Sequence, residues 1–298
     1  MRPIPSLLKN QFLRVIKKMS DLNLKEALDL SIEVSKKAGI LLLRYQKQLG
    51  KLKTNYKEGQ GVVSKADIAS ENLIIKSLLK KFPQTKMLGE ESSFAQNIKN
   101  FKEIKKNPYT WIIDPLDGTT NFLNNFDYYA VCISLAHYGV PVLGVVYRPS
   151  NGDLFYCLKG KGAKFKSAAK KRVTTLKTSG QKKKLKDSLL ITGFSTEKGQ
   201  VFGKEFKIFK DLAIRSRGVR RLGSAALDMC YVASGIFDGF WESNLAPWDV
   251  AASGVICLEA GIEVKNLKGE PFTPFNDDFV AANGPLMKEL LKAFSKKA

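Results

Sequence analysis

The chain has 298 residues, of which 44% are hydrophobic and 26% are charged, a composition typical of soluble globular proteins. It contains no uninterrupted run of about 18 apolar residues, the length that a bilayer-spanning helix needs, so a transmembrane segment is not expected. The 49 Lys and Arg residues outnumber the 28 Asp and Glu residues, and the resulting net charge of +21 would attract polyanions.

Residues 1–22 form a basic leader that we expect to lie outside the main domain. Its apolar side chains share one helical face, but Lys9 and Arg14 interrupt them and no cleavage site of small residues follows, so a secretory signal is not indicated. We expect a helix packed on its own domain, or an untranslated leader with initiation at Met19; a peripheral membrane or partner contact is the alternative. The apolar face comprises Leu8, Phe12, Val15, Ile16 and Met19.

Two amphipathic helices follow the leader. Periodic apolar residues predict a long helix from Asn23 to Gln48, with Gly50 as its stop. A second helix is predicted from about Ala66 to Phe82, because Pro83 cannot continue it.

From Tyr109 onward the apolar pattern becomes that of β-strands. Four apolar runs, "YTWII", "YYAVCISLAHYG", "PVLGVVYRP" and "DLFYCLKG", are separated by turn sequences such as "PSNGD". Because the connections are short, we predict an antiparallel meander.

Residues 164–186, "KFKSAAKKRVTTLKTSGQKKKLK", carry the densest positive charge, and we predict a flexible loop or a hairpin there. Aromatic residues are almost absent from this run, so it lacks the stacking platform of proteins that bind single-stranded nucleic acid. We interpret the segment as a solvated face, and weak contact with a polyanion or RNA is the alternative.

The next elements alternate between strand and helix. "SLLITGF" predicts a buried strand, and Ser224 can cap a helix that runs through Ala233. "IFDGFWE" predicts a further strand that ends at Glu242.

Two helices are predicted toward the end of the chain. "WDVAASGVICLEAG" predicts a helix with Asp249 in its first turn and Gly261 as its C-terminal stop. Pro285 begins a last amphipathic helix. Since no proline-rich linker interrupts the pattern, we expect residues 23–298 to form a single compact domain with two packed halves, approximately 23–186 and 187–298.

The cysteines are spaced without close pairs, and each lies in an apolar stretch. This spacing argues against a zinc cluster and against a disulfide scaffold. We expect small buried side chains in a reducing cytoplasm. The four residues are Cys132, Cys157, Cys230 and Cys257.

The chemistry available to the chain is narrowed by its single histidine, His137, which lies within the meander. Mechanisms that require a His–Asp or Cys–His pair are therefore not favoured, because only this one histidine could serve in them. We interpret His137 as a strand residue with a satisfied hydrogen bond. Carboxylates and a metal remain.

The sequence "WIIDPLDGTTNF" places Asp114 and Asp117 at the end of a buried strand. Pro115 bends the chain between them, so both carboxylates can face one point, as a hard divalent cation requires; a plain turn with aspartate bonded to backbone amides is the alternative. The following Gly118, Thr119 and Thr120 can form an anion-binding nest of backbone N–H groups, which together with the acids indicates Mg²⁺ bridging to a phosphate.

Further carboxylates also lie at the ends of predicted elements. Glu90 follows a short strand, Asp67 follows "VVSKA", and Asp249 lies in the first turn of a helix, whose positive end favours its ionised form. Each alone is ordinary, but together they invite a comparison of families.

Three motifs, "GEES" at 89–92, "WIIDPLDGTTNF" at 111–122 and "WDVAASGVICLEAG" at 248–261, closely resemble those of the inositol monophosphatase family, in the same order. The resemblance covers roughly residues 24–285. It implies an α+β fold, a layered α-β-α-β-α sandwich of the inositol monophosphatase and fructose-1,6-bisphosphatase type. It also implies a Mg²⁺-dependent phosphomonoesterase with two or three ions, usually a homodimer in the cytoplasm.

The resemblance also assigns roles to individual residues. Asp67 matches a carboxylate that orients a water held by the metal, and the Thr119 hydroxyl together with Glu90 matches the pair that activates the attacking water. Glu242 matches the residue that bonds substrate hydroxyls. Matched metal ligands are Glu90, Asp114, the Leu116 carbonyl, Asp117 and Asp249; matched substrate-binding residues are Gly118, Thr119, Gly223, Ser224, Ala225 and Glu242.

The expected reaction is hydrolysis of a small phosphorylated polyol by metal-activated water, without a covalent phosphoenzyme. Inositol 1-phosphate is the expected substrate, because "DGTTNF" resembles the inositol phosphatase branch. Fructose-1,6-bisphosphatase or nucleotide bisphosphate phosphatase activity is the enzymatic alternative. An added RNA-associated or transcription-associated role, suggested by the net charge, is the alternative of another class.

Overall fold

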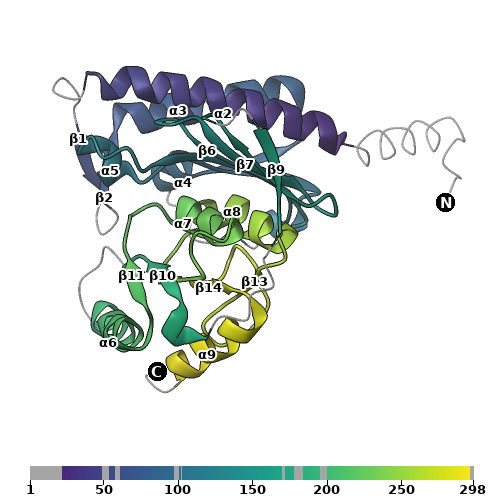
Figure 1. The fold of residues 1–298 in the computed structure, drawn as a ribbon. Coiled ribbons are helices and arrows are strands. Elements are labelled where there is room, and N and C mark those ends of the chain that lie inside the picture. Colours follow the sequence, from purple (N-terminus) through teal and green to yellow (C-terminus); the bar gives the residue numbers. More distant parts are fainter. Residues whose placement is uncertain are drawn as a thin grey trace, which may run out of the picture.

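The computed structural model describes residues 22–48, 54–57, 61–96, 101, 103–169, 172–177, 184–194 and 200–295. The described residues form five layers, a helix pair, a seven-stranded sheet, a second helix pair, a five-stranded sheet and an outer helix pair (Figure 1). This is the predicted α-β-α-β-α sandwich. The expected helical leader lies outside the described residues.

The first layer contains α2 (Leu24–Gln46) and α3 (Lys65–Lys81), which pack against each other above the seven-stranded sheet. Asn23 caps α2, because its side chain accepts hydrogen bonds from the first free amides of the helix. Both predicted helices are confirmed within two residues at the ends described. The predicted stop at Gly50 lies outside the described residues.

The seven-stranded sheet has the order β3-β4-β5-β6-β7-β8-β9. Strands β4 to β7 form the predicted antiparallel meander, and only β3 and β4 run parallel. In the described part of the basic segment, β8 and β9 pair as a hairpin, the second of the two expected forms. The bounds are β3 (Lys86–Gly89), β4 (Tyr109–Asp117), β5 (Ala130–His137), β6 (Val140–Arg148), β7 (Asp153–Leu158), β8 (Ala163–Ser167) and β9 (Arg172–Leu176).

The five-stranded sheet has the order β11-β10-β12-β14-β13. Strand β10 runs parallel to both β11 and β12, whereas β14 is antiparallel to its two neighbours. The bounds are β10 (Leu189–Thr192), β11 (Gly218–Arg220), β12 (Gly239–Ser243), β13 (Glu263–Lys265) and β14 (Asp278–Ala282).

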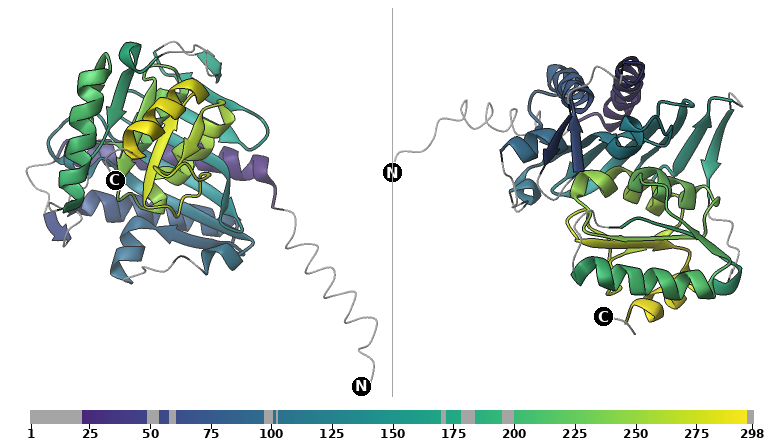
Figure 2. Two further views of the ribbon diagram at one scale, coloured as in Figure 1. Left: turned by 90° about the horizontal axis from the view of Figure 1, so that it is seen from below. Right: turned by 90° about the vertical axis from the view of Figure 1, so that its left-hand side faces the viewer.

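The middle layer contains α7 (Ala225–Ala233) and α8 (Pro247–Glu259), which lie between the two sheets (Figure 2, right). Their side chains share one core with residues of both sheets, so these helices are apolar almost all round. Ser224 caps α7 through its side chain, as predicted. Gly261, with a φ of 83°, ends α8 in the left-handed conformation that glycine adopts without strain.

The outer helices α6 (Gln200–Arg215) and α9 (Gly284–Ser295) cover the far side of the five-stranded sheet (Figure 1). The sequence pattern predicted α9 but not α6. Shorter elements complete the description: β1 (Thr54–Lys57), β2 (Gly61–Ser64), α4 (Glu90–Ala95), α5 (Thr119–Leu123) and the 3₁₀ turns η2 (Ile104–Lys106) and η3 (Leu185–Asp187). Among the helices described, none is both long and apolar enough to cross a bilayer.

Candidate active site

Asp114 and Asp117 lie on the last part of β4, and an irregularity of that strand brings them together. In a regular strand, residues three apart point to opposite faces. Here Asp114 pairs with Cys132 and Asp117 with Ala130, so β4 contains one residue more than β5 over this stretch. Such a bulge shifts the alternation by one position and returns both acids to one side. The strand therefore continues through Asp117, rather than ending before the turn as the sequence suggested.

Asp117 is held by the amino-terminal end of α7. Its Oδ2 accepts hydrogen bonds from the Ser224 hydroxyl at 2.5 Å and from the Ala226 amide at 2.9 Å. The Ser224 side chain is buried, with its hydroxyl directed at Asp117. These donors favour the charged form, yet burial dominates and raises the pKa of Asp117 from 3.8 to about 6.

Asp249 lies in the first turn of α8, where the sequence placed it. Its Oδ2 accepts a hydrogen bond from the Ala246 amide at 2.7 Å, just before the helix begins. This bond orients the carboxylate and satisfies a backbone donor at the positive end of the helix.

Glu90 begins α4, directly after β3. Because β3 runs parallel to β4 with Gly89 opposite Ile113, Glu90 emerges from its strand next to Asp114. The parallel pairing thus aligns two acids that are separated by an entire loop in the sequence.

The acids share one electrostatic neighbourhood. Burial raises the pKa of Asp114 well above its usual range, and repulsion from Glu90, Asp117 and Asp249 raises it further. The pKa of Asp249 is raised in the same way, by burial and then by Glu90 and Asp117. Mutual repulsion of buried carboxylates is the cost that a bound divalent cation would offset.

The residues fit Mg²⁺ by the chemistry of their donors. They offer carboxylate and carbonyl oxygens, which hard cations prefer. Among the described residues, Oδ2 of Asp114 and Oδ1 of Asp249 accept no hydrogen bond, so each acid keeps an oxygen available. Within the same ranges, however, no three Asp, Glu, His or Cys side chains are arranged so that they could hold a metal as they stand.

The turn after Asp117 has the conformation expected of an anion-binding loop. Gly118 has a φ of 98°, in the left-handed region that favours glycine, and α5 begins at the next residue. The Thr119 hydroxyl donates to the Leu116 carbonyl at 3.0 Å. Asn121 then donates to the carbonyls of Tyr128 at 2.7 Å and Leu222 at 2.8 Å, which ties the turn to the loop before α7.

Glu242, at the end of β12, borders the same region from the other sheet. Gly193 lies against its carboxylate, and a Cβ at that glycine would overlap the glutamate oxygens. Burial raises the pKa of Glu242 well above its usual range, with a further rise from Asp228 and Asp117 that Arg221 partly opposes. The electrostatic influence of Asp117 places Glu242 close to the acid cluster.

Asp67 lies buried in the first turn of α3, one turn before Ser70, whose hydroxyl donates to the Pro115 carbonyl at 3.1 Å. This bond holds α3 beside the bulge. His137 is the last residue of β5, as a strand residue is expected to be placed, and its exposed ring packs against Tyr109 and Tyr138.

The sequence did not reveal two residues, Asn121 and Glu71, whose side chains hold the backbone of the site in place. Asn121 was visible inside the motif, but its partner near residue 222 was not. Glu71, four residues after Asp67, accepts backbone hydrogen bonds from the start of α4. Helical spacing from Asp67 was the one signal that could have pointed to it.

A model of the inositol monophosphatase family matches residues 23–298. The chain belongs to this family. It is 36% identical over 268 residues to the putative Nus factor SuhB of Neisseria meningitidis, with 90% of this chain and 97% of that protein covered. It is 35% identical over 269 residues to the inositol-1-monophosphatase of Mesorhizobium japonicum, with 90% and 96% covered.

The fold agrees with this membership. The crystal structure of the extragenic suppressor protein suhB from Bartonella henselae matches with a TM-score of 0.81 and 32% identity, covering 92% of this chain and 100% of that chain. Membership of the inositol monophosphatase family supports a phosphatase. The relatives named above include both an inositol-1-monophosphatase and a putative Nus factor.

We predict that the stability of the metal-free protein depends on pH because of these acids. Folding raises the pKa values of these acids, so the folded state binds protons more tightly than the unfolded state does. Their contribution to the free energy of unfolding therefore falls as the pH rises. For Asp117 the fall runs from near pH 4 through about 6, the pKa of its carboxyl in the folded protein. Asp114→Asn should therefore raise the melting temperature of the metal-free protein at about pH 8, and much less at about pH 5.

Added Mg²⁺ should raise the melting temperature of the wild type at the higher pH, and Asp114→Asn should blunt that rise. Differential scanning fluorimetry with and without Mg²⁺ measures both effects. A wild-type melting temperature that does not respond to Mg²⁺ at either pH would contradict the metal fit.

Proposed function

We propose that the protein is a Mg²⁺-dependent phosphomonoesterase whose preferred substrate is inositol 1-phosphate, hydrolysed to inositol and phosphate. The observation that carries the proposal is the cluster of mutually repelling buried acids beside the left-handed turn at Gly118. Negative charge of this density would repel a phosphate unless cations were bound between the two. The family match supports the same chemistry.

The proposed ligands of two or three Mg²⁺ ions are Glu90, Asp114, the Leu116 carbonyl, Asp117 and Asp249. When bound, Mg²⁺ would lower the pKa of a water and neutralise charge on the leaving oxygen. The carboxylates of Asp117 and Asp249 are oriented before any metal binds. One oxygen of each accepts a hydrogen bond from a backbone amide at the start of a helix.

The Thr119 hydroxyl and Glu90 are proposed to position the attacking water. The hydroxyl proton of Thr119 is committed to the Leu116 carbonyl, so its oxygen faces other groups as an acceptor only. A water that donates its protons to Thr119 and Glu90 would direct a lone pair toward phosphorus. Asp67, one turn from the bond that anchors α3 at Pro115, is proposed to steady the same water.

Backbone amides at Gly118 and Thr119 are proposed to bind the phosphate oxygens. The first amides of α5 have no partner within the helix, and the Asn121 side chain ties this turn to the carbonyls of Tyr128 and Leu222. Because this scaffold exists before the substrate arrives, it can stabilise the charge of the transition state without reorganisation.

Glu242 is proposed to select the substrate. The half-buried Glu242 carboxylate could accept hydrogen bonds from the free hydroxyls of a ring, and Gly223, Ser224 and Ala225 would form the wall behind that ring. The same arrangement also suits the sugar of fructose 1,6-bisphosphate, which is the enzymatic alternative. Nucleotide bisphosphates are a further enzymatic alternative.

A second role, binding RNA or a transcription complex, is favoured by two observations. A relative at 36% identity is named a putative Nus factor. The net charge is +21, and the exposed lysines of the β8–β9 hairpin, Lys164 and Lys166, extend the basic surface. Such a surface binds polyanions in a salt-dependent way.

We further propose that the protein is a homodimer, because an aromatic row reaches the surface next to a hollow. Ring centroids follow one another from Phe126 to Tyr128 at 6.3 Å, to Tyr231 at 6.0 Å, to Phe155 at 5.7 Å and to Phe165 at 4.5 Å. Phe126 is 46% exposed at one end of the row. The inner rings of Tyr128 and Phe155 are buried, so the exposed ring of Phe126 is the part of the row that a second protein chain would cover.

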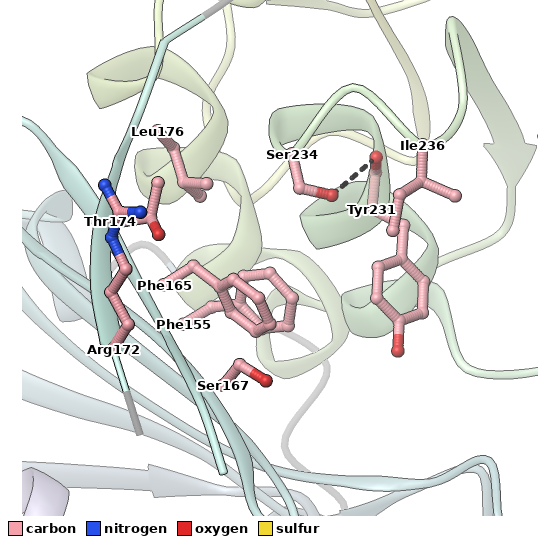
Figure 3. A pocket seen from close by; sticks show the side chains of 9 residues that line it. All are labelled: Phe155, Phe165, Ser167, Arg172, Thr174, Leu176, Tyr231, Ser234 and Ile236. Carbon is pink, nitrogen blue, oxygen red and sulfur yellow. Dashed lines mark hydrogen bonds between the residues drawn. The ribbon is translucent and has the colours of Figure 1, made fainter. Parts of the chain in front are cut away.

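The hollow has a volume of about 290 Å³ and is lined in part by three rings of the row, Tyr231, Phe155 and Phe165. Figure 3 shows the stacked Phe155 and Phe165 between β9 and the turn after α7. Ile236, at its rim, is 57% exposed. The exposed apolar side chains of Phe126 and Ile236 mark the proposed dimer face.

We propose a cytoplasmic location and a catalytic domain spanning residues 23–298, with residues 1–22 as a separate leader. All four cysteines are buried and free, which suits a reducing compartment. The family match begins at residue 23, which supports the domain boundary.

The substrate prediction is tested by phosphate release from a panel of phosphoesters. We expect Mg²⁺-dependent turnover of inositol 1-phosphate above that of fructose 1,6-bisphosphate and adenosine 3′,5′-bisphosphate. Asp114→Asn should lower kcat by about 10³-fold or more, because it removes a proposed ligand of the metal. Glu242→Gln should mainly raise KM. No turnover of inositol 1-phosphate with Mg²⁺ would overturn the main proposal.

The dimer prediction is tested by sedimentation velocity. Ile236→Glu places a charge on the proposed apolar face and should convert the dimer to a monomer. Ile214→Glu, at an isoleucine that is 74% exposed on α6, is the matched control and should leave the dimer intact. Equal sedimentation of both variants and the wild type would contradict the assigned face.

The binding prediction is tested by fluorescence anisotropy with single-stranded RNA at two salt concentrations. Neutralising Lys182, Lys183 and Lys184 to Gln should weaken binding and reduce its salt dependence, because fewer counterions are released. Asp114→Asn should bind RNA as the wild type does. The absence of wild-type binding at moderate salt would remove this second role.

A further inference from the structure

Glu71, on α3, is a buried carboxylate that none of the proposed catalytic steps uses. Only 4% of its surface is exposed. Its Oε2 accepts a hydrogen bond from the Glu91 amide and its Oε1 accepts one from the Ser92 amide, each at 2.8 Å. Both donors belong to the first turn of α4, the helix that begins with Glu90.

This contact replaces a cap that α4 lacks. The amides of a first helical turn have no partner within the helix, and a negative charge there is favourable. The residue in the N-cap position, Gly89, has no side chain that could accept these bonds. A helix of six residues is too short to be stable by itself, so its start depends on outside partners.

The glycine before Glu90 is explained by the same carboxylate. Gly89 has a φ of −102° and a ψ of 154°, an extended conformation open to any residue. A Cβ at this position would nevertheless overlap the carboxylate of Glu71. Gly89 is therefore required by space, because the carboxylate of Glu71 passes directly against the backbone that leads into Glu90.

Helix α3 thereby holds two segments that carry proposed ligands. Ser70 bonds the Pro115 carbonyl between Asp114 and Asp117, and the adjacent Glu71 bonds the start of α4. Both oxygens of Glu71 are occupied by backbone amides, so the side chain itself is not suited to bind a metal. We propose that Glu71 is a positioning residue that fixes Glu90 relative to the acids of β4, and so sets the affinity for Mg²⁺. The inference rests on the proposed function of Glu90 as a ligand.

The test compares Glu71 with a second glutamate whose carboxylate also accepts hydrogen bonds from two backbone amides. Glu259, at the end of α8, accepts hydrogen bonds from the amides of Gly160 at 2.9 Å and Gly162 at 2.8 Å, away from the acid cluster. Glu71→Gln and Glu259→Gln each keep the size of the side chain, but leave an amide NH₂ facing one backbone donor. Mg²⁺ binding is measured without substrate by isothermal titration calorimetry, and folding is checked by circular dichroism.

We expect Glu71→Gln to raise the dissociation constant for Mg²⁺ about tenfold or more, the size typical when a group that orients a ligand is lost. In assays, kcat at low Mg²⁺ should fall and recover at saturating Mg²⁺, with KM for inositol 1-phosphate within about twofold of wild type. Glu259→Gln should bind Mg²⁺ as the wild type does. An unchanged Mg²⁺ affinity in Glu71→Gln, or an equal loss in both variants, would overturn the positioning role.

A second variant covers the case in which Glu71→Gln does not fold. Gly89→Ala displaces the Glu71 carboxylate without altering it, and should also weaken Mg²⁺ binding. Adding Glu71→Asp, which is one methylene shorter, should recover part of the loss, and no recovery would contradict the inference. Failure of the proposed function is recognised separately, because the wild type itself would then bind no Mg²⁺.

Discussion

The repulsion between buried carboxylates is the constraint around which this molecule is arranged. Asp114 and Asp117 are buried and Asp249 is half-buried, the pKa of each is raised, and Glu90 adds to the repulsion on Asp114 and Asp249. Charges in such positions are unfavourable unless fixed donors or cations compensate them. The fold supplies donors at the starts of α7 and α8, which bond Asp117 and Asp249 directly. The remaining imbalance suits a site that is complete only when cations are bound.

The layered architecture makes this arrangement rigid. Helices α7 and α8 lie between two sheets, so each is packed on opposite sides and neither can rotate freely. Their amino-terminal ends reach the end of β4, while β3 aligns Glu90 with the same point. Ligands carried by separate elements can be held accurately only where those elements are themselves held by a core.

The names borne by relatives, phosphatase and Nus factor, correspond to different parts of the molecule in the roles proposed here. The acids are interior and depend on burial, whereas the lysines of the β8–β9 hairpin are exposed and act through long-range charge. A change in one set need not disturb the other.

Much of the fold was open to prediction because its signals are local. Helix α2 begins after an asparagine cap and α7 after a serine cap, and the meander follows from short turns between apolar runs. The acids themselves could be recognised from their motifs. Helix α6 was not predicted. The parallel pairing of β10 with β11 and β12 was not predicted either, since strand order depends on partners that are distant in the sequence.

By itself, the sequence determined which acids could serve as metal ligands and which local helices and strands carry them, because periodicity and capping act within a turn or two of each residue. Only the tertiary structure decided how the donors meet. The bulge that turns Asp114 and Asp117 to one side depends on pairing with β5, and the cap that Glu71 provides spans 20 residues between two helices. Neither contact leaves a local pattern, because each is formed by packing between segments that the chain brings together only when it folds.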